Sequence, residues 1–280
     1  MHWLTARFTI DLTQPRVMGI VNVTPDSFSD GGQHADARAA LRHCERLLRD
    51  GADLLDIGGE STRPGAPPVS LDEELARVLP VVRGAVSLGV PVSVDTYKPA
   101  VMRAVLDAGA DIINDVWALR REDALAAVAA HPACGVCVMH MHLEPQTMQV
   151  APMGGDAVAA VRGFLRERVA ALEAAGVSRG RIALDPGIGF GKTVEQNFAL
   201  LAAQPALAAE GLPWLVGWSR KSSLGAITGR AEAAQRVAAS VAAAVLAAER
   251  GAHILRVHDV RETVDALKVL AAVRAAGAAH

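Results

Sequence analysis

Cysteine is scarce in this sequence, with three residues in 280, an odd number. Such a count does not support a disulfide scaffold and fits a reducing compartment, so we expect a cytoplasmic protein. The N-terminal residues, MHWLTAR, lack the apolar core of a signal peptide. The longest stretch without Asp, Glu, Lys or Arg, residues 124–143, contains three histidines, one proline and one glycine, which argues against a membrane helix.

An excess of either charge is also missing. The chain has 28 Lys and Arg against 30 Asp and Glu, a net charge of −2. Its electrostatics therefore favour neither nucleic acid nor acidic membranes, and we expect neither partner. Lysine is rare: the four lysines are Lys98, Lys192, Lys221 and Lys268. Because arginine is the usual cation here, a lysine at the end of a strand, as Lys221 is, suggests that a compact ammonium is required there.

Apolar residues are plentiful, at 51% of the chain, and follow a repeating pattern. From residue 17 onward, a short apolar run, a polar loop and an amphipathic helical stretch follow one another. The predicted strands cover residues 17–22, 53–58, 91–96, 111–116, 135–141, 181–186, 213–218 and 254–258. The predicted helices cover residues 36–50, 71–87, 98–108, 122–130, 155–175, 193–203, 231–250 and 261–276.

Strict alternation of eight strands and eight helices over about 250 residues is typical of a (β/α)8 TIM barrel. Near-continuous apolar strands also suit a parallel sheet that is buried on both faces. We therefore expect a single α/β domain over residues 1–280, in which residues 1–15 form a short β-hairpin that caps the barrel. A doubly wound open sheet is the alternative fold for the same pattern.

Every predicted strand ends in a residue that can bind or catalyse, and TIM barrels carry their chemistry at this end. These residues are Asn22, Asp56, Asp95, Asn114 with Asp115, His140, Asp185, Ser219 with Lys221, and Arg256 with His258. A barrel without a site would need only a few of them, as helix caps or salt bridges. Long polar loops over residues 22–32 and 58–68 indicate a lid over a site.

Three of these residues suit a heterocycle that presents NH groups. Asp95, Asn114 and Asp185 offer hydrogen-bond acceptors, and Asn114 is also a donor. Lys221 supplies donors for a carbonyl group or a ring nitrogen. The sequence therefore predicts a polar heterocycle site.

The last strand and the first strand indicate an anion site. Arg256 and His258 are two residues apart on a strand, so both point to the same face. A closed barrel places them beside the first strand, which ends at Asn22. Asn22 would complete the anion site with Arg256 and His258. Alternatively, its side-chain oxygen can bind Mg²⁺, a cation that keeps several waters beside phosphates.

Three further motifs match known sites incompletely. Residues 187–193, GIGFGKT, resemble a phosphate loop but have Pro186 where that pattern requires glycine, so we interpret them as a flexible loop with Phe190 as a stacking wall. The pair His140 and His142 has metal-ligand spacing, although a structural or outer-pocket role is favoured over zinc. The two cysteines in CGVC, residues 134–137, have redox spacing but lie at a strand entrance, which favours buried thiols.

Seven segments together resemble the dihydropteroate synthase family of pterin-binding barrels. They are MGIVNVTPDSFSDGG at 18–32, DIGGESTRPG at 56–65, SVDT at 93–96, IND at 113–115, LDPG at 184–187, SRKS at 219–222 and RVHD at 256–259. The resemblance covers nearly the whole chain in order. Short pieces such as VDT are unspecific, whereas the first two and last two segments are highly specific.

The resemblance implies a transferase of folate biosynthesis. Such an enzyme joins 6-hydroxymethyl-7,8-dihydropterin pyrophosphate to p-aminobenzoate with Mg²⁺, is a target of sulfonamides and usually forms a homodimer. By motif position, Asp95, Asn114, Asp185 and Lys221 would hold the pterin, and Asn22, Arg256 and His258 the pyrophosphate and the metal. Thr62, Arg63, Phe190, Arg220 and Ser222 would border the p-aminobenzoate site.

Three rival functions remain at this stage. A pterin-binding methyl transferase acting on a corrinoid protein would share the Asp and Asn pocket, yet it has no evident need for Arg256 and His258 as a pyrophosphate group. A silent relative would bind pterin without turnover. A metal-dependent hydrolase would use His140 and His142 to hold zinc.

Overall fold

The computed structural model describes residues 1–23, 33–61, 65–144, 148 and 151–277. Eight parallel strands form one sheet in the order β8-β7-β6-β5-β4-β3-β10-β9. They are β3 (Arg16–Asn22), β4 (Leu54–Gly58), β5 (Val92–Asp95), β6 (Ile112–Asp115), β7 (Gly135–Met139), β8 (Ile182–Asp185), β9 (Leu215–Val216) and β10 (Ile254–Val257). A parallel bridge between Leu184 and Trp214 joins the two outer strands. The sheet therefore closes, which confirms the predicted barrel, and the open-sheet alternative is wrong.

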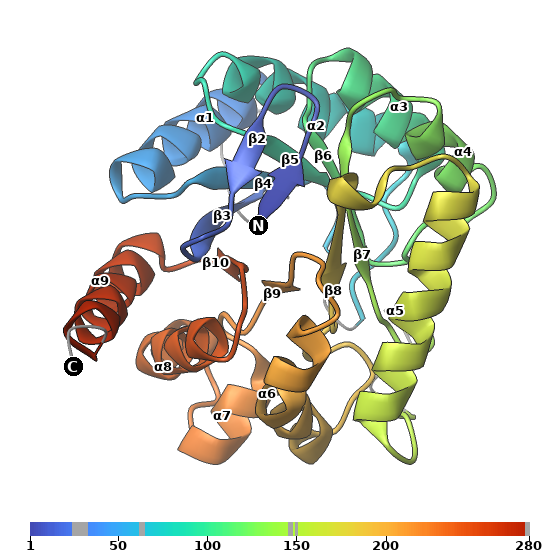
Figure 1. Cartoon of the computed structure of the whole chain (residues 1–280). Coiled ribbons are helices and arrows are strands. Elements are labelled where there is room, and N and C mark those ends of the chain that lie inside the picture. The colour runs from blue at the N-terminus through green and yellow to red at the C-terminus, as the bar shows by residue number, and fades with distance from the viewer. Residues whose placement is uncertain (24–32, 62–64, 145–147, 149–150, 278–280) are drawn as a thin grey trace.

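Helices surround this barrel as an outer ring (Figure 1). They are α1 (Gln33–Arg49), α2 (Leu71–Val86), α3 (Pro99–Asp107), α4 (Ala124–Ala129), α5 (Ala157–Ala174), α6 (Val194–Ala208), α7 (Ser222–Thr228), α8 (Val237–Glu249) and α9 (Val260–Gly277). No single described helix is both long and apolar enough to cross a membrane. Residues 222–228 and 233–249 pass that test only as a pair, and the pair is bent by 77°.

The segment after β9 differs from the prediction. In place of one helix over residues 231–250, the short helix α7 precedes a 3₁₀ turn, Ala233–Arg236, and then α8. Gly229 ends α7 in a left-handed conformation, with φ of 69°. The guanidinium of Arg236 donates to the carbonyls of Arg230 and Arg220, at 2.9 Å each, and so fixes the turn before α8 begins.

Alternate residues of each strand serve two different cores. In β3, Val17 and Val21 pack in the layer between strands and helices, whereas Met18 packs inside the barrel. The interior cluster near the amino ends of the strands consists of Met18, Leu54, Ile112, Cys137, Ala183, Leu215 and Ile254. Apolar side chains thus fill this half of the barrel interior, and the carboxyl ends of the strands carry polar side chains.

The N-terminal hairpin seals the apolar end, as predicted. Strands β1 (His2–Leu4) and β2 (Thr9–Asp11) pair in antiparallel fashion and lie across one end of the barrel in Figure 1. Trp3 is fully buried against the interior cluster and donates its indole N–H to the carbonyl of Arg181 at 2.8 Å. Arg7, between the two strands, pairs with the buried carboxylate of Asp111 at 2.7 Å.

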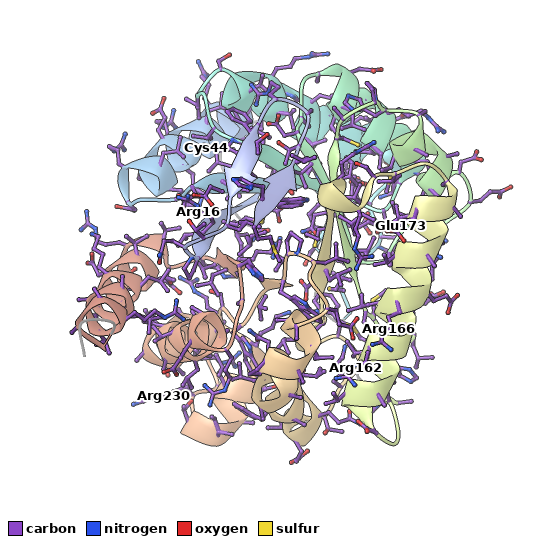
Figure 2. All side chains as sticks on the ribbon, viewed as in Figure 1. Arg16, Cys44, Arg162, Arg166, Glu173 and Arg230 are labelled. Carbon is purple, nitrogen blue, oxygen red and sulfur yellow. The ribbon has the colours of Figure 1, made fainter. Side chains whose placement is uncertain are left out.

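The surface carries exposed arginine pairs that link neighbouring helices. Arg162 and Arg166, both labelled in Figure 2, extend from α5 to Glu210, at 3.4 Å and 3.0 Å. Because the Arg162 side chain is 35% exposed and that of Arg166 66% exposed, solvent screens both pairs and we expect each to contribute little to stability.

Candidate active site

The carboxyl ends of five strands carry polar side chains that meet inside the barrel. They are Asp56 on β4, Asp95 on β5, Asn114 on β6, Asp185 on β8 and Arg256 on β10. The strand register places Asp95 beside Asn114 and Met139 beside Asp185. The parallel alignment therefore brings residues up to 200 positions apart in the chain to one level. We call these five residues the polar layer.

Arg256 is the centre of the polar layer. Its Nε donates to Oδ2 of Asp56 at 2.6 Å, and its Nη2 donates to Oδ2 of Asp95 at 3.0 Å. Asp56 is fully buried and also accepts from the hydroxyl of Ser93, at 2.6 Å, and from the amide of Asn114, at 3.4 Å. Two carboxylates thus hold one guanidinium in a fixed orientation.

The layer alters the ionisation of its members. Burial raises the pKa of Asp95 to about 7, although Arg256 opposes the rise, and the neighbouring Asp56 adds to it. Burial lowers the pKa of Arg256, but the carboxylates of Asp56 and Asp95 outweigh burial and hold that pKa above its ordinary value. Arg256 therefore stays charged, while Asp95 titrates close to neutral pH.

Asp185 lies on the other side of the polar layer, and Lys221 faces it from the segment after β9. Asp185 accepts the backbone N–H of Gly187 on Oδ1 at 2.6 Å, and burial raises its pKa. Burial lowers the pKa of Lys221 to about 8, while the nearby Asp185 acts to raise it. The Lys221 ammonium lies 4.2 Å from the centre of the Phe190 ring, as a cation–π contact. A carboxylate and an ammonium thus face the same space.

An apolar wall accompanies these polar groups at the carboxyl end of the barrel. Its buried members are Val116, Met139, Met141 and Met148, and the partly buried rings of Trp117 and Phe190 pack on them. Flat apolar surfaces beside a few directed polar groups are typical of a site for a planar heterocycle. Phe190 was predicted as a stacking wall, and its position in this cluster fits that role.

Asn22 ends β3, and His258 directly follows the neighbouring strand β10, at the same end of the barrel. Nδ1 of His258 contacts the hydroxyl of Ser219 at 2.9 Å, and the backbone N–H of His258 donates to that hydroxyl at 3.1 Å. Ser219 therefore fixes the orientation of the imidazole ring. Asn22 is the last residue of β3, next to β10 in the sheet, and is partly exposed. The barrel thus brings Asn22 close to the strand that carries Arg256 and His258.

The residues predicted to border the p-aminobenzoate site are placed unevenly. Ser222 is exposed at the start of α7. Arg220 adopts a left-handed conformation, with φ of 60°, and its guanidinium pairs with both oxygens of Asp259, at 2.6 Å and 3.1 Å. Thr62 and Arg63 lie outside the described residues. Of this set, Phe190 contacts Lys221, which faces the polar layer.

The surroundings of the histidine and cysteine motifs indicate structural roles for these residues. Burial lowers the pKa of His140 to about 3, and its ring lies edge-on to Phe164, at 5.1 Å between centres. Among the described residues, no three His, Cys, Asp or Glu side chains are placed to hold a metal ion. Cys134 and Cys137 are free and buried, which confirms the prediction of buried thiols. The metal-dependent hydrolase thus finds no support in the described residues.

The segment that resembles a phosphate loop has its lysine turned inward. Nζ of Lys192 donates to the carbonyls of Gly187, Phe190 and His140, at 2.8 Å, 3.1 Å and 3.2 Å. The side chain is buried, with 3% of the residue exposed. The flexible loop expected from the sequence is therefore held from within, and its lysine is engaged with the protein's own backbone.

Sequence reasoning gave Asp56 no role, although it placed this residue at a strand end. Its pairing with Arg256 depends on the barrel register and leaves no local signal. The sequence also did not reveal an ion-pair cluster after β4, in which Lys98 pairs with the carboxylates of Glu60 and Glu74. The hydroxyls of Tyr97 and Thr96 donate to the same two carboxylates, at 2.9 Å and 2.7 Å. This cluster fixes Glu60, just before the predicted residues Thr62 and Arg63.

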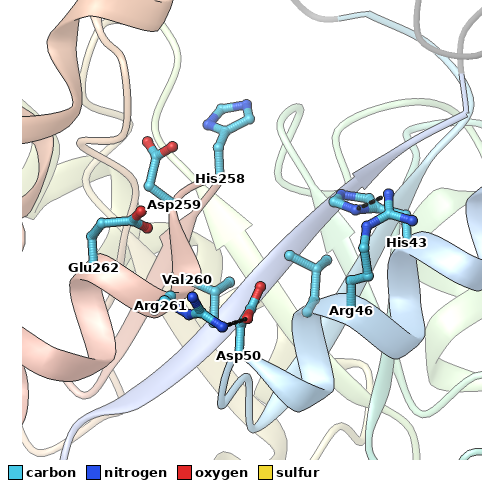
Figure 3. Close-up of a pocket in the computed structure, with 9 residues that line it drawn as sticks. His43, Arg46, Asp50, His258, Asp259, Val260, Arg261 and Glu262 are labelled. Carbon is cyan, nitrogen blue, oxygen red and sulfur yellow. Dashed lines mark hydrogen bonds and ion pairs between the residues drawn. The ribbon is translucent and has the colours of Figure 1, made fainter.

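A shallow surface pocket of about 330 Å³ lies between α1 and the start of α9, beside His258 (Figure 3). Arg261 bridges to Asp50 across it at 3.4 Å, and Arg46 contacts His43 at 3.2 Å. The ring of His258 points away from that bridge in the same view. Three carboxylates, of Asp50, Asp259 and Glu262, and two guanidinium groups, of Arg46 and Arg261, line the pocket together with His258.

Comparison with known proteins identifies the class first. Residues 18–258 match the family of pterin binding enzymes. With the closed barrel and its polar layer, this match defines a pterin-binding barrel enzyme.

Individual relatives identify the family more closely. The chain is 52% identical over 272 residues to the dihydropteroate synthase of Neisseria meningitidis serogroup B, covering 95% of both chains. A Burkholderia cenocepacia dihydropteroate synthase complexed with 7,8-dihydropteroate is 55% identical, with a TM-score of 0.91 and coverage of 100% of this chain and 98% of that one. The Yersinia pestis enzyme with a sulfonamide drug complex is 47% identical, with a TM-score of 0.92 and coverage of 98% and 100%.

The chain belongs to the dihydropteroate synthase family. Its activity is the synthesis of 7,8-dihydropteroate from a pterin pyrophosphate and p-aminobenzoate, a transfer that forms a carbon–nitrogen bond in folate biosynthesis. The comparisons thus favour the synthase over the methyl transferase.

Proposed function

We propose that the polar layer, Lys221 and the apolar wall form the active site of this transferase. The observation that carries the proposal is the convergence of Asp95, Asn114, Asp185, Lys221 and Arg256 at the carboxyl end of one barrel, as the ion pairs and shifted pKa values describe. Shifted ionisation in a cleft with an apolar wall is typical of a functional site.

The pterin is held by acceptors on one edge and a donor on the other. Asp185 accepts from the amino group and ring N–H of the pterin, and Asn114 and Asp95 complete that edge. Lys221 donates to the oxo group or the N5 edge. Because these bonds involve charged partners, heterocycles without the matching edge leave buried groups unpaired and are rejected.

Pyrophosphate leaves next to Arg256 and His258. Contacts with described residues use two of the five N–H donors of Arg256, so the guanidinium keeps donors for an anion. These charges stabilise the leaving group as the carbon–oxygen bond breaks. Inorganic pyrophosphate should therefore bind the free enzyme and lose affinity on Arg256→Met. Undiminished binding by that variant would contradict this role, and failure of the wild type to bind would favour a pterin-binding methyl transferase.

Mg²⁺ fits the site near Asn22, Arg256 and His258 only as a partner of pyrophosphate. The side-chain oxygen of Asn22 is one neutral ligand, and the carboxylates of Asp56 and Asp95 already hold Arg256. A hard cation that keeps its waters and binds phosphate oxygens needs no more from the protein. When bound, Mg²⁺ would neutralise charge on the pyrophosphate.

The substitution is dissociative in this proposal. Loss of pyrophosphate leaves positive charge on the pterin methylene, which the ring delocalises, and the carboxylates of Asp95 and Asp185 lie near that ring to stabilise it. The arylamine nitrogen then bonds to the methylene carbon and gives up one N–H proton, which the departing pyrophosphate can accept, while the surrounding loops exclude water. A large secondary deuterium isotope effect at the methylene is expected. A small one would favour direct displacement.

The arylamine site lies beside Phe190, with Thr62, Arg63, Arg220 and Ser222 as its other proposed members. Arg63 and the Ser222 hydroxyl would hold the benzoate carboxylate. Since Arg220 is paired with Asp259, its part is to shape the loop before α7. We propose that sulfonamides bind at this position, as the sulfonamide complex of the Yersinia relative suggests.

Pterin affinity tests the proposed site directly. Asp185→Asn keeps the shape of the side chain and removes its charge, so the Kd for the pterin substrate should rise about 10- to 100-fold by calorimetry, as for loss of a charge-assisted bond. Asp107→Asn, at the exposed end of α3, is the matched control and should leave affinity unchanged. Equal affinity of the Asp185 variant and the wild type would refute the pterin assignment.

We also propose a cytoplasmic homodimer that acts on small molecules. Exposed apolar side chains gather late in the chain, with Ile227 at 59%, Val269 at 65% and Val273 at 64% exposure. Val269 and Val273 are one turn apart on α9, and exposed apolar side chains so placed suit contact with a second copy of the same chain. Light scattering should give twice the mass of one chain for the wild type and a smaller mass for Val273→Glu. A wild-type monomer would contradict the dimer. The three free thiols are consistent with a reducing compartment.

A further inference from the structure

Lys192 is a buried cation whose partners are backbone carbonyls. Its Nζ lies 2.8 Å from the carbonyl oxygen of Gly187, 3.1 Å from that of Phe190 and 3.2 Å from that of His140. An ammonium group has three N–H donors, so three acceptors satisfy it completely. A lysine buried in this way is rare and needs an explanation beyond surface charge.

The three carbonyls belong to the segments that build the active site. Gly187 directs its N–H to the Asp185 carboxylate at 2.6 Å. Phe190 places its ring against the Lys221 ammonium at 4.2 Å. His140 follows β7 and donates its own N–H to the carbonyl of Asp185 at 3.0 Å. Lys192 therefore ties together the turn beside Asp185, the aromatic wall and the end of the neighbouring strand.

We propose that Lys192 is a positioning residue, which holds the loop over residues 187–191 so that Asp185 and Phe190 are correctly oriented for both substrates. The proposal rests on the proposed roles of Asp185 and Phe190. It also gives the lysine of this phosphate-loop-like sequence a different role: its ammonium donates to the carbonyls of Gly187, Phe190 and His140.

Glycine conformations leave the loop dependent on such an anchor. Gly187, Gly189 and Gly191 all have positive φ, of 68°, 82° and 69°. At Gly187 a Cβ atom would lie 1.9 Å from the carbonyl oxygen of His140, so the two segments approach too closely for a side chain. Because glycine gains much conformational freedom when released, an anchor inside the loop strongly affects its order.

A lysine titration locates the side chain in solution. Burial lowers the pKa of Lys192 to about 7, while Asp185 acts to raise it and Lys221 to lower it. With four lysines in the chain, ¹³C labels at Cε give four resolvable signals, and Lys192→Arg assigns one of them. A midpoint near 7 shows that the ammonium is buried in the ligand-free enzyme. A midpoint near 10.4, the value of an exposed lysine, would overturn the proposal.

Kinetics separate positioning from simple stabilisation. Lys192→Met keeps the length of the side chain and removes its donors, so kcat/KM should fall about 100-fold for both substrates, as for a misplacement of about 1 Å. Lys192→Arg restores donors and should recover part of that loss. Lys268→Met, at an exposed site on α9, is the matched control and should behave as wild type. A lower unfolding temperature with unchanged kinetics would refute positioning.

Amide hydrogen exchange in residues 187–191 is a readout without substrate. Faster exchange in Lys192→Met than in the Lys268→Met control is expected. Unchanged exchange overturns the proposal. Faster exchange with unchanged pterin affinity and kinetics would refute positioning, while the Asp185→Asn variant tests the site role of Asp185 separately. If Lys192→Met does not fold, the Lys192→Arg variant carries both tests, with the wild type as the reference. Faster exchange in residues 187–191 together with a lower kcat/KM is expected, because arginine fits the three carbonyls less well than lysine. Faster exchange with wild-type kcat/KM in that variant contradicts the proposal.

Discussion

Arg256 and Asp56 are 200 residues apart in the chain and 2.6 Å apart in the barrel, where Nε of the arginine donates to Oδ2 of the aspartate. The carboxylate is fully buried, while 23% of the arginine side chain is exposed toward the site. Asp56 thus holds the Arg256 guanidinium, the cation that we place beside the pyrophosphate, from its buried side. A buried carboxylate with one principal cation partner makes the pair sensitive to loss of either member.

Replacement of Asp56 should therefore harm both activity and stability. Asp56→Asn leaves the partly exposed Arg256 with one carboxylate, and loss of a pair whose carboxylate is fully buried costs about 3 kcal/mol of unfolding free energy. We expect kcat/KM to fall about 10- to 100-fold, as for loss of a supporting partner. Asp53→Asn, at the amino end of β4, breaks a half-exposed pair with Arg16 and is the matched control. Wild-type kinetics in Asp56→Asn would contradict a supporting role.

Asp95 should make stability depend on pH in a defined direction. Its folded pKa is raised to about 7 from an ordinary 3.8, so between these values the folded state binds more protons than the unfolded state. Stability from this group is therefore present below pH 3.8 and is lost as the pH rises through 7. Asp95→Asn should be more stable relative to wild type at pH 8 than at pH 5, by about 1 kcal/mol or more. Denaturant unfolding at the two pH values measures this difference, and the opposite trend would refute it.

The hairpin cap should affect stability without affecting catalysis. Arg7 pairs with both oxygens of Asp111, at 2.7 Å and 2.9 Å, and donates to the carbonyl of Val86 at 3.0 Å. Arg7→Ala leaves Asp111 buried with its charge uncompensated, so we expect about 1–3 kcal/mol of lost unfolding free energy. Because the hairpin closes the end opposite the site, kcat and KM should stay unchanged below the unfolding range. A changed KM at full folding would show that the two ends communicate.

Arg63 should distinguish between the two substrates. Its proposed partner is the carboxylate of p-aminobenzoate, so Arg63→Ala should raise the KM for p-aminobenzoate more than the KM for the pterin substrate. Steady-state kinetics with each substrate varied in turn measure both constants. An equal rise in the two would remove this role from Arg63.

Most of the fold could be predicted from the sequence, because each barrel unit repeats an apolar strand, a polar loop and an amphipathic helix. The run 17–22 predicted β3, and the hairpin at the N-terminus was anticipated. The short helix α7 was missed because it has seven residues and contains Gly225, so it shows no helical period. Residues 231–236 were assigned to a helix by composition, whereas contacts from Arg236 to distant carbonyls decide their conformation.

The sequence predicted which residues lie at the strand ends of the site, but it did not predict the hydrogen bonds and ion pairs between them. Asp95, Asp185, Lys221 and Arg256 were all expected at the carboxyl end of the barrel, where the structure places them. The support of Arg256 by Asp56 depends on strand register, which local patterns do not encode. The inward turn of Lys192 likewise depends on carbonyls supplied by two separate segments.

The most direct test of the account is pyrophosphate release from 6-hydroxymethyl-7,8-dihydropterin pyrophosphate and Mg²⁺, measured with and without p-aminobenzoate. The account predicts that 7,8-dihydropteroate forms, with matching pyrophosphate release, only when the arylamine is present. Measurable pterin binding with no release under either condition would contradict it, because the polar layer would then mark a pocket without its chemistry.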